Sequence, residues 1–264
     1  MPWNLYQLFW FFVIYSFLGW CVEVIFAAVN SGKLVNRGFL NGPVCPIYGF
    51  GMVLVLVSLW PLRNNLFLLF FGGMLVTSFL ELVTGWALKT LFHTSWWDYS
   101  DRPFNIGGYI CLSFSLVWGL AVVGVIRILH PPIERLVSRV PDRLNPWLTI
   151  PVALVFLADA ILTVVTITGL NRDLGELERI GRALHRGSDA LTQVVGGTAL
   201  AADEHMEQKR GELETRRDFL RARIAERRYL GAARLMRAFP RMTHLHHAQL
   251  LEDLKEDLRQ RLHR

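Results

Sequence analysis

The chain has 264 residues, of which 52% are hydrophobic and 19% are charged, with a formal net charge of +6. The charge is unevenly placed: positions 1–170 hold nine Lys or Arg and seven Asp or Glu, whereas the 94 residues after them hold nineteen and fifteen. This split excludes an ordinary water-soluble globular protein. It predicts a membrane domain over residues 1–170 and a charged, water-soluble tail over residues 171–264.

Five apolar runs approach the length needed to cross a lipid bilayer, since about 20 helical residues span a hydrocarbon core of about 30 Å. They cover residues 5–29, 44–60, 65–91, 109–129 and 147–170. The second run is the shortest, and Pro46, Gly49 and Gly51 near its start also fit a re-entrant segment. The sequence thus predicts an all-α, polytopic membrane protein with about five transmembrane helices.

The first run is expected to remain in the protein as an anchor, because it lacks a basic segment before it and a small-residue cleavage site after it. The three cysteines, Cys21, Cys45 and Cys111, lie in or beside apolar runs. The cysteines are expected to pack as small apolar side chains, and the disulfide framework of an exported protein is not expected.

A unit of two helices and a connecting loop is predicted to occur twice. The loops share an Arg, a Phe two residues later, a Gly five residues after the Arg, and then a Cys: Arg37, Phe39, Gly42 and Cys45 in the first, and Arg102, Phe104, Gly107 and Cys111 in the second. Two spanning helices return the chain to its starting side, so both loops and the tail are expected on one face of the membrane. The Lys and Arg count differs little between the two faces, and the Arg-rich tail without export features favours the cytoplasmic face of a cell membrane.

Three acidic residues lie inside apolar runs: Glu23, Glu81 and Asp159. An ionised side chain costs about 2.5–3.5 kcal/mol at the centre of a membrane helix, so such residues usually face a bundle interior or a water-filled cavity. They are therefore predicted to line a substrate or ion pathway. The alternative is a structural role, in which hydrogen bonds hold the helices together through groups such as Ser16, Thr77, Ser78 or Thr84.

Arg37 and Arg102 recur at matching places in the two loops, and they are the natural counter-charges for Glu23 and Glu81. One Glu–Arg pair from each unit would build a polar pocket at the centre of the bundle. The alternative for both arginines is that they anchor helix ends at the lipid headgroups.

The loops also contain turn-forming and polar residues suited to a close-packed site. Asn41 and Asn105 stand beside glycines that let backbone N–H groups approach a ligand or a facing loop. Asp98 follows Trp96 and Trp97, and aromatic rings beside a carboxylate can recognise a cation. An aromatic belt at the membrane interface explains the two tryptophans equally well.

Two segments of the sequence resemble a known family. GFLNGPVCPIYGFG after GWCVEV, together with FHTSWWDYSDRPFNIGGYICLSFSLVWG, is similar to the CmpB family of small bacterial membrane proteins, which are labelled ABC-transporter type IV permeases and resemble a group of vertebrate transmembrane proteins. The likeness covers about residues 5–132 and, more loosely, the fifth run. It implies a polytopic membrane protein with a permease-like role and leaves the tail undefined.

No nucleotide-binding machinery is encoded, because Gly32 and Lys33 lack the upstream Gly and following Ser or Thr of a phosphate loop. A permease of this kind would need a separate ATPase, and five helices would call for a homodimer. Catalytic signatures such as H-E-x-x-H and G-x-S-x-G are missing too, so the chain is not expected to be an enzyme. No cofactor or metal site is predicted.

The tail is predicted to be helical, as a coiled coil or helical hairpin. Its apolar residues follow steps of three and four, with Gly181 and Ser188 interrupting the seam: Leu170, Leu174, Leu177, Leu184, Leu191 and Val195, and then Met206, Leu213, Leu220, Ile224 and Leu235. The tail would pair two protomers, recruit a soluble partner or lie on anionic lipid. Nucleic acid is not an expected partner, because the acids dilute the bases.

Two hypotheses follow. In the first, the chain is a transport component with a polar intramembrane site formed by the two repeated units. In the second, it is a non-transporting membrane adaptor that recruits a partner through its tail, and the buried acids are structural.

Overall fold

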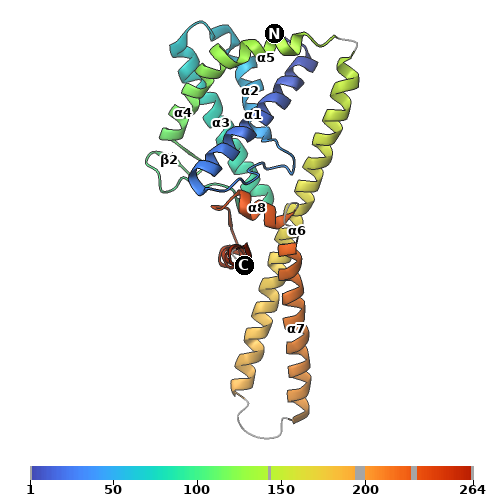
Figure 1. Ribbon diagram of the computed structural model, residues 1–264. Coiled ribbons are helices and arrows are strands. Elements are labelled where there is room, and N and C mark those ends of the chain that lie inside the picture. The colour runs from blue at the N-terminus through green and yellow to red at the C-terminus, as the bar shows by residue number, and fades with distance from the viewer. Residues whose placement is uncertain (1, 142–143, 194–199, 227–230, 263–264) are drawn as a thin grey trace. The chain divides into compact units, whose positions relative to one another are not determined.

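The computed structural model describes residues 2–141, 144–193, 200–226 and 231–262 (Figure 1). Most of these residues are helical, which confirms the predicted helical class. The chain divides into two compact units. The first unit comprises Met1–Val164 with Ala238–Met242, and the second comprises Val165–Arg237 with Thr243–Arg264.

Helices account for nearly all of the first unit. In chain order they are α1 (Leu5–Ser31), α2 (Pro46–Leu59) with the short helix η1 (Trp60–Leu62), α3 (Leu66–Phe92), α4 (Leu112–Gly124), the π-helical η2 (Val125–Leu129), α5 (His130–Ser138) and the first part of α6 (Asn145–Gln193). Two-residue strands complete the described elements: β1 (Thr94–Ser95), β2 (Asn105–Ile106), β3 (Ile110–Cys111) and β4 (Thr243–His244). Strands β2 and β3 pair as an antiparallel hairpin.

Among the described residues, four helical stretches are long and apolar enough to cross a membrane: Leu5–Asn30, Leu66–Phe92, Leu112–Ser138 and Asn145–Arg186. The second apolar run forms only the shorter helix Pro46–Leu62. Pro46 begins this helix, and a 14-residue α-helix such as α2 is about 21 Å long, less than the hydrocarbon thickness. A count of five spans therefore stays a prediction.

Side-chain caps set the starts of the two longest helices of the first unit. At α1, Asn4 accepts a hydrogen bond from the Gln7 backbone N–H, and the Gln7 side chain accepts one from the Asn4 N–H, which makes a capping box. At α3, the Asn65 side chain accepts from two backbone N–H groups. Helix α1 is capped at its C-terminus by Gly32, whose φ of 67° lies in the left-handed region that favours glycine.

Glycines allow the helices of each pair to approach closely. A Cβ at Gly49 of α2 would lie 2.3 Å from the Ser16 hydroxyl and 2.4 Å from the Phe12 carbonyl oxygen of α1. A Cβ at Gly119 of α4 would lie 2.9 Å from the Phe70 carbonyl oxygen of α3. Such small-residue contacts are typical of helix packing in membranes, where van der Waals fit replaces the hydrophobic effect.

The core of the first unit contains a buried histidine in an aromatic surround. The His130 ring is fully buried, and the rings of Trp3, Phe11 and Trp60 pack edge-on against it at 4.9–5.6 Å. The Tyr15 hydroxyl lies 3.1 Å from its Nδ1. Since Tyr15 precedes Glu23 by about two helical turns, this group lies toward the opposite end of α1 from the acid.

The second unit contains the rest of α6, α7 (Leu200–Glu226), α8 (Ala232–Ala238) up to Arg237, and α9 (Ala248–Leu262). Helix α6 continues through Leu170 without a break, so the predicted domain boundary falls inside a helix. Helices α6 and α7 run side by side (Figure 1), joined by an ion pair of 2.8 Å between Glu176 and Arg216.

The second unit also has buried apolar positions of its own, which are Leu174, Leu177, Ile180, Leu220, Ile224, Leu251, Leu254 and Leu258. The coiled coil itself stays a prediction. Three of its predicted seam side chains, Leu191, Val195 and Met206, lie outside the described part of the chain.

The close approach of α1 and α2 generates a first prediction. Gly49→Ala places a methyl group against Ser16 and Phe12, so we expect the free energy of unfolding in detergent to fall by about 1–3 kcal/mol, as overpacking usually costs. Gly124→Ala is the matched control, because a Cβ there meets nothing within 4 Å. Equal effects of the two substitutions would contradict the packing described here.

Candidate functional site

Glu23 of α1 lies in a polar site at the start of α2. The Arg37 guanidinium approaches Glu23 Oε2 with Nε and Nη2, each at 3.4 Å, and the Tyr48 hydroxyl donates to Oε1 at 2.7 Å. Arg37 belongs to loop 1 (residues 32–45), which joins α1 to α2. The Cys45 N–H donates to the Ser16 carbonyl oxygen, a contact that turns the start of α2, and with it Tyr48, back onto α1.

Glu81 of α3 has a different set of neighbours. The Tyr99 hydroxyl donates to its Oε1 at 3.3 Å. The Trp118 indole of α4 is near enough to interact with the same carboxylate. Among the described residues, however, no hydrogen bond of normal geometry reaches the buried Oε2. The Glu81 carboxylate therefore accepts fewer hydrogen bonds than the Glu23 carboxylate.

The surroundings of the two carboxylates are linked through aromatic side chains. The Tyr48 ring packs edge-on against Trp118 at 5.7 Å. Tyr99 interacts electrostatically with both Glu81 and Glu23. We call the set Glu23, Arg37, Tyr48, Glu81, Tyr99 and Trp118 the acid cluster.

Tyr99 enters the acid cluster from loop 2 (residues 93–111), which joins α3 to α4. Its ring stacks on Phe114 at 4.9 Å. Burial raises the pKa of the Tyr99 phenol above its usual value, and the Glu81 carboxylate raises this pKa further. The hydroxyl therefore stays protonated and remains a hydrogen-bond donor.

Arg102 does not join Glu81, contrary to the pairing expected from the sequence. Its side chain is exposed, and its backbone N–H donates to the Tyr99 carbonyl oxygen at 2.8 Å. This turn directs the Tyr99 side chain toward Glu81. Within the described part of the chain, a tyrosine hydroxyl therefore replaces the predicted guanidinium at the second acid.

Asp159 of α6 binds the backbone of loop 1. Its Oδ1 accepts from the Asn41 backbone N–H at 3.0 Å and from the Asn41 side chain at 2.8 Å. Its Oδ2 accepts from the Gly42 N–H at 2.7 Å. The same Asn41 amide contacts the Thr163 hydroxyl, one turn along α6, at 3.3 Å. Asp159 and Asn41 thus lie together, and their contact fastens the loop that carries Arg37.

Asn105 and Asp98 organise loop 2 from within. The Asn105 side chain donates to the Arg102 carbonyl oxygen at 2.8 Å and accepts from the Gly108 N–H at 3.2 Å. The exposed Asp98 carboxylate accepts from the Ser100 hydroxyl and backbone N–H, and these bonds hold the pKa of Asp98 below its usual range. Among the described residues, neither side chain forms a hydrogen bond with the acid cluster, so both support the loop that presents Tyr99.

A segment far along the chain also contributes to the first unit. The Phe239 ring lies against Trp96, with centroids 5.0 Å apart, and the Arg37 guanidinium lies 5.9 Å from the same ring. Nearby, Arg241 lies 3.9 Å from the Asp101 carboxylate. Residues 238–242 therefore contact both loops of the first unit.

Sequence reasoning missed the tyrosines and Trp118. Ser and Thr hydroxyls were the alternative partners of the acids, but Ser78 bonds to Ser115 at 2.7 Å and Thr77 bonds to its own helix. One feature of the sequence could have pointed to Tyr48: it stands three residues after Cys45, the residue that precedes α2. Within the described ranges, no three His, Cys, Asp or Glu side chains are grouped as a metal site requires.

The contact between Asp159 and loop 1 generates a second prediction. Asp159→Ala removes the acceptor of three N–H groups, and one hydrogen bond to a charged group contributes about 1.5–3 kcal/mol. We expect the Cys45 thiol, which is 5% exposed, to react with a maleimide at least about tenfold faster in a variant whose other two cysteines are alanine. Asp98→Ala, which removes an acid from loop 2, is the control, and an unchanged Cys45 rate in Asp159→Ala would contradict the role given to Asp159.

Comparison with known proteins places the chain in a family. Comparisons with curated proteins and with solved structures gave no match. Residues 10–164 match the family described as "Putative ABC-transporter type IV". The match covers more than half of the chain and includes both loops and the three acids of the apolar helices, Glu23, Glu81 and Asp159. The predicted resemblance is thereby confirmed, and the chain belongs to the CmpB family of ABC-transporter-type membrane proteins.

Proposed function

We propose that the chain is the membrane component of a transporter and that its substrate passes the acid cluster. The observation that carries the proposal is the linkage of Glu23 and Glu81, from two separate helix pairs, through Tyr48, Tyr99 and Trp118. Ionisable groups within membrane helices usually mark substrate or ion pathways. The family match supports a transport role of this kind.

The charges of the acid cluster favour a cationic substrate or a proton. Arg37 offsets the charge of Glu23, whereas no Lys or Arg among the described residues forms an ion pair with Glu81. With both acids ionised the cluster carries one net negative charge. The faces of Trp118 and the two tyrosines add the quadrupole that attracts cations. Oε2 of Glu81, which accepts no hydrogen bond of normal geometry from the described residues, is the atom that would receive the substrate.

The two loops serve as covers of this site in the proposal. Loop 1 holds Arg37 against Glu23 and is fastened by Asp159, and loop 2 presents Tyr99 to Glu81. In this arrangement α2 also crosses the membrane, which brings the number of membrane segments to five. Both loops lie on the cytoplasmic face with the tail. The two helix pairs are treated as a tandem repeat, which the matching positions of Cys45 and Cys111 directly before α2 and α4 support.

Other chains complete the proposed transporter. A separate ATPase would supply the energy, because the sequence lacks a phosphate loop. A homodimer would supply enough helices to enclose a path. The chain would bind and move its substrate without chemical change, so no enzymatic step is assigned to it.

Binding provides a test that needs no ATPase. Glu23→Gln with Glu81→Gln removes both negative charges while keeping the side-chain shape, so we expect methylammonium binding to purified protein in nanodiscs to weaken at least about tenfold. The same substitutions should abolish methylammonium or proton flux in proteoliposomes that show it. The measurements are isothermal titration and uptake of labelled methylammonium.

Asp101→Asn is the matched control, because Asp101 is an exposed acid of loop 2 that lies outside the acid cluster. It should leave binding and flux unchanged. The proposed cation site does not exist if the wild-type protein binds neither methylammonium nor protons. It does not exist either if the binding is unchanged when Glu23 and Glu81 are replaced.

One observation favours the adaptor function as a second candidate. The second unit has buried apolar residues of its own and ion pairs that link α6 to α7, including Asp173 with Arg223. A self-contained helical unit of this kind fits a role in recruiting a soluble partner. An adaptor would retain its partner in the Glu23→Gln and Glu81→Gln variant and lose it when the second unit is altered.

A further inference from the structure

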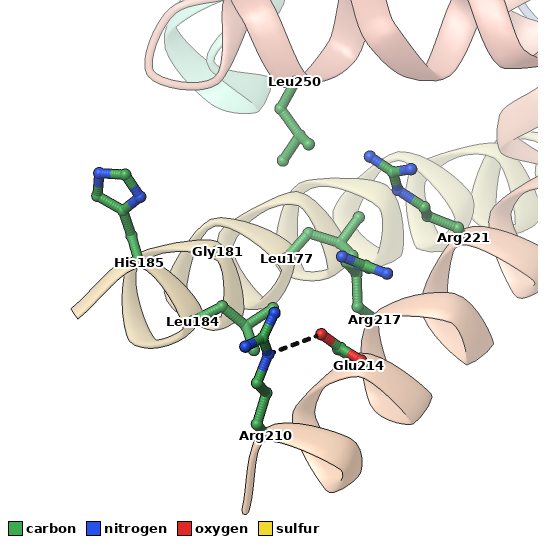
Figure 2. A pocket seen from close by; sticks show the side chains of 9 residues that line it. All are labelled: Leu177, Gly181, Leu184, His185, Arg210, Glu214, Arg217, Arg221 and Leu250. Atoms are coloured by element: carbon green, nitrogen blue, oxygen red, sulfur yellow. Dashed lines mark hydrogen bonds and ion pairs between the residues drawn. The ribbon is translucent and has the colours of Figure 1, made fainter. Parts of the chain in front are cut away.

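A cavity of about 400 Å³ lies in the second unit between α6, α7 and α9 (Figure 2). Leu177, Gly181 and Leu184 of α6 form its apolar side, and Figure 2 shows Leu250 of α9 facing them. The guanidinium groups of Arg210 and Arg217, from α7, lie beside these leucines.

The cavity occurs where the apolar seam of α6 is interrupted. Leu170, Leu174 and Leu177 follow steps of four and three and are at most 5% exposed. The next two positions of this pattern are Gly181 and Leu184. A Cβ built at Gly181 meets nothing within 4 Å. Gly181 itself is exposed, so a larger apolar side chain there would extend over the open side of the cavity.

Helix α7 places charge where its own seam should be apolar. Leu220 and Ile224 are buried seam positions, and a step of three before Leu220 falls on Arg217. Arg210 stands a further seven residues before Arg217. Local departures from good packing are expected at functional sites. Here a glycine on one helix and arginines on the other depart from the pattern at the same level.

The cavity lining has an excess of positive charge. It contains three arginines and one carboxylate, Glu214, which pairs with Arg210 Nε at 3.2 Å. Arg217 pairs through Nε with Asp218, and both arginines keep their terminal nitrogens free of hydrogen bonds to described residues. The buried Nε of Arg221 has no hydrogen-bond partner among the described residues, and Nη1 of the same guanidinium lies 3.7 Å from the Asp257 carboxylate of α9.

We propose that this cavity binds a small amphipathic anion, with a phosphate-type head group on Arg210, Arg217 and Arg221 and a short apolar body against the leucines. Guanidinium groups match phosphate oxygens through paired hydrogen bonds. The volume falls within the range of about 300–1,000 Å³ that is usual for small-molecule sites. Such a head group belongs to a soluble organic phosphate or to an anionic lipid.

Titration of the full chain in neutral-lipid nanodiscs with hexyl phosphate tests the proposal, with empty nanodiscs as the blank. We expect saturable binding by the wild type and at least tenfold weaker binding by Arg210→Gln with Arg217→Gln. Arg182→Gln is the matched control, because this exposed α6 arginine lies outside the cavity. Inorganic phosphate should bind more weakly than hexyl phosphate.

A second variant separates loss of the site from loss of folding. Gly181→Leu fills the cavity and completes the apolar seam, so we expect it to abolish hexyl phosphate binding and to raise the unfolding temperature. Gly211→Ala, an exposed α7 glycine outside the cavity lining, is the control and should bind normally. If phosphatidic acid in the nanodisc competes with hexyl phosphate, the natural ligand is a lipid, and if it does not, the ligand is soluble.

Three results would overturn the proposal. The first is wild-type affinity in Gly181→Leu, and the second is wild-type affinity in the double arginine variant. The third is equal affinity for inorganic phosphate and hexyl phosphate, which would remove any role for the leucines.

Discussion

A carboxylate placed in an apolar helix must find partners within the protein, and this constraint shapes the first unit. An unsatisfied polar group in a hydrocarbon environment costs several kcal/mol. Glu23 is met by Arg37 and Tyr48, and Asp159 is met by the backbone of loop 1. The loops that connect the helices are thus ordered by acids that lie within the helices.

The two helix pairs meet this constraint in different ways. Tyr48 stands three residues after Cys45, and the matching position after Cys111 is Phe114, which has no hydroxyl. Tyr99 from the longer loop 2 stacks on Phe114 and supplies the missing hydroxyl to Glu81. The result is one acid beside a guanidinium and another beside neutral donors. This asymmetry concentrates the uncompensated negative charge at Glu81.

Much of the membrane architecture follows from hydropathy, because lipid-facing helices must be apolar over a fixed length. The predicted runs 5–29 and 65–91 agree closely with α1 and α3. Other ends were missed for a physical reason: helical hydrogen bonding does not stop where hydropathy changes. Helix α6 passes Leu170 into the charged region, and the helical stretch that begins at Leu112 continues to Ser138, past the predicted end at residue 129.

The candidate site was only partly predictable for a related reason. A loop arginine close in sequence to Glu23 is a natural counter-charge, and the structure brings Arg37 to it. The equivalent reasoning failed at Arg102, because loop 2 turns at Tyr99 and Arg102. The partners of Asp159 lie more than 115 residues away in sequence and include main-chain groups, which no pattern of side chains can reveal.

The contact between Asp159 and loop 1 also bears on how this loop can diverge among related proteins. Two successive amides, at Asn41 and Gly42, donate to the carboxylate, and Pro43, which has no N–H, stands immediately after them. Proline at either donating position would delete a bond. The Asn41 side chain adds a third bond to the same carboxylate, and a Cβ at Gly42 would lie 3.2 Å from Asp159 Oδ2. Evolutionary drift in this loop is therefore restricted both by the direction of its peptide groups and by the side chains at these two positions.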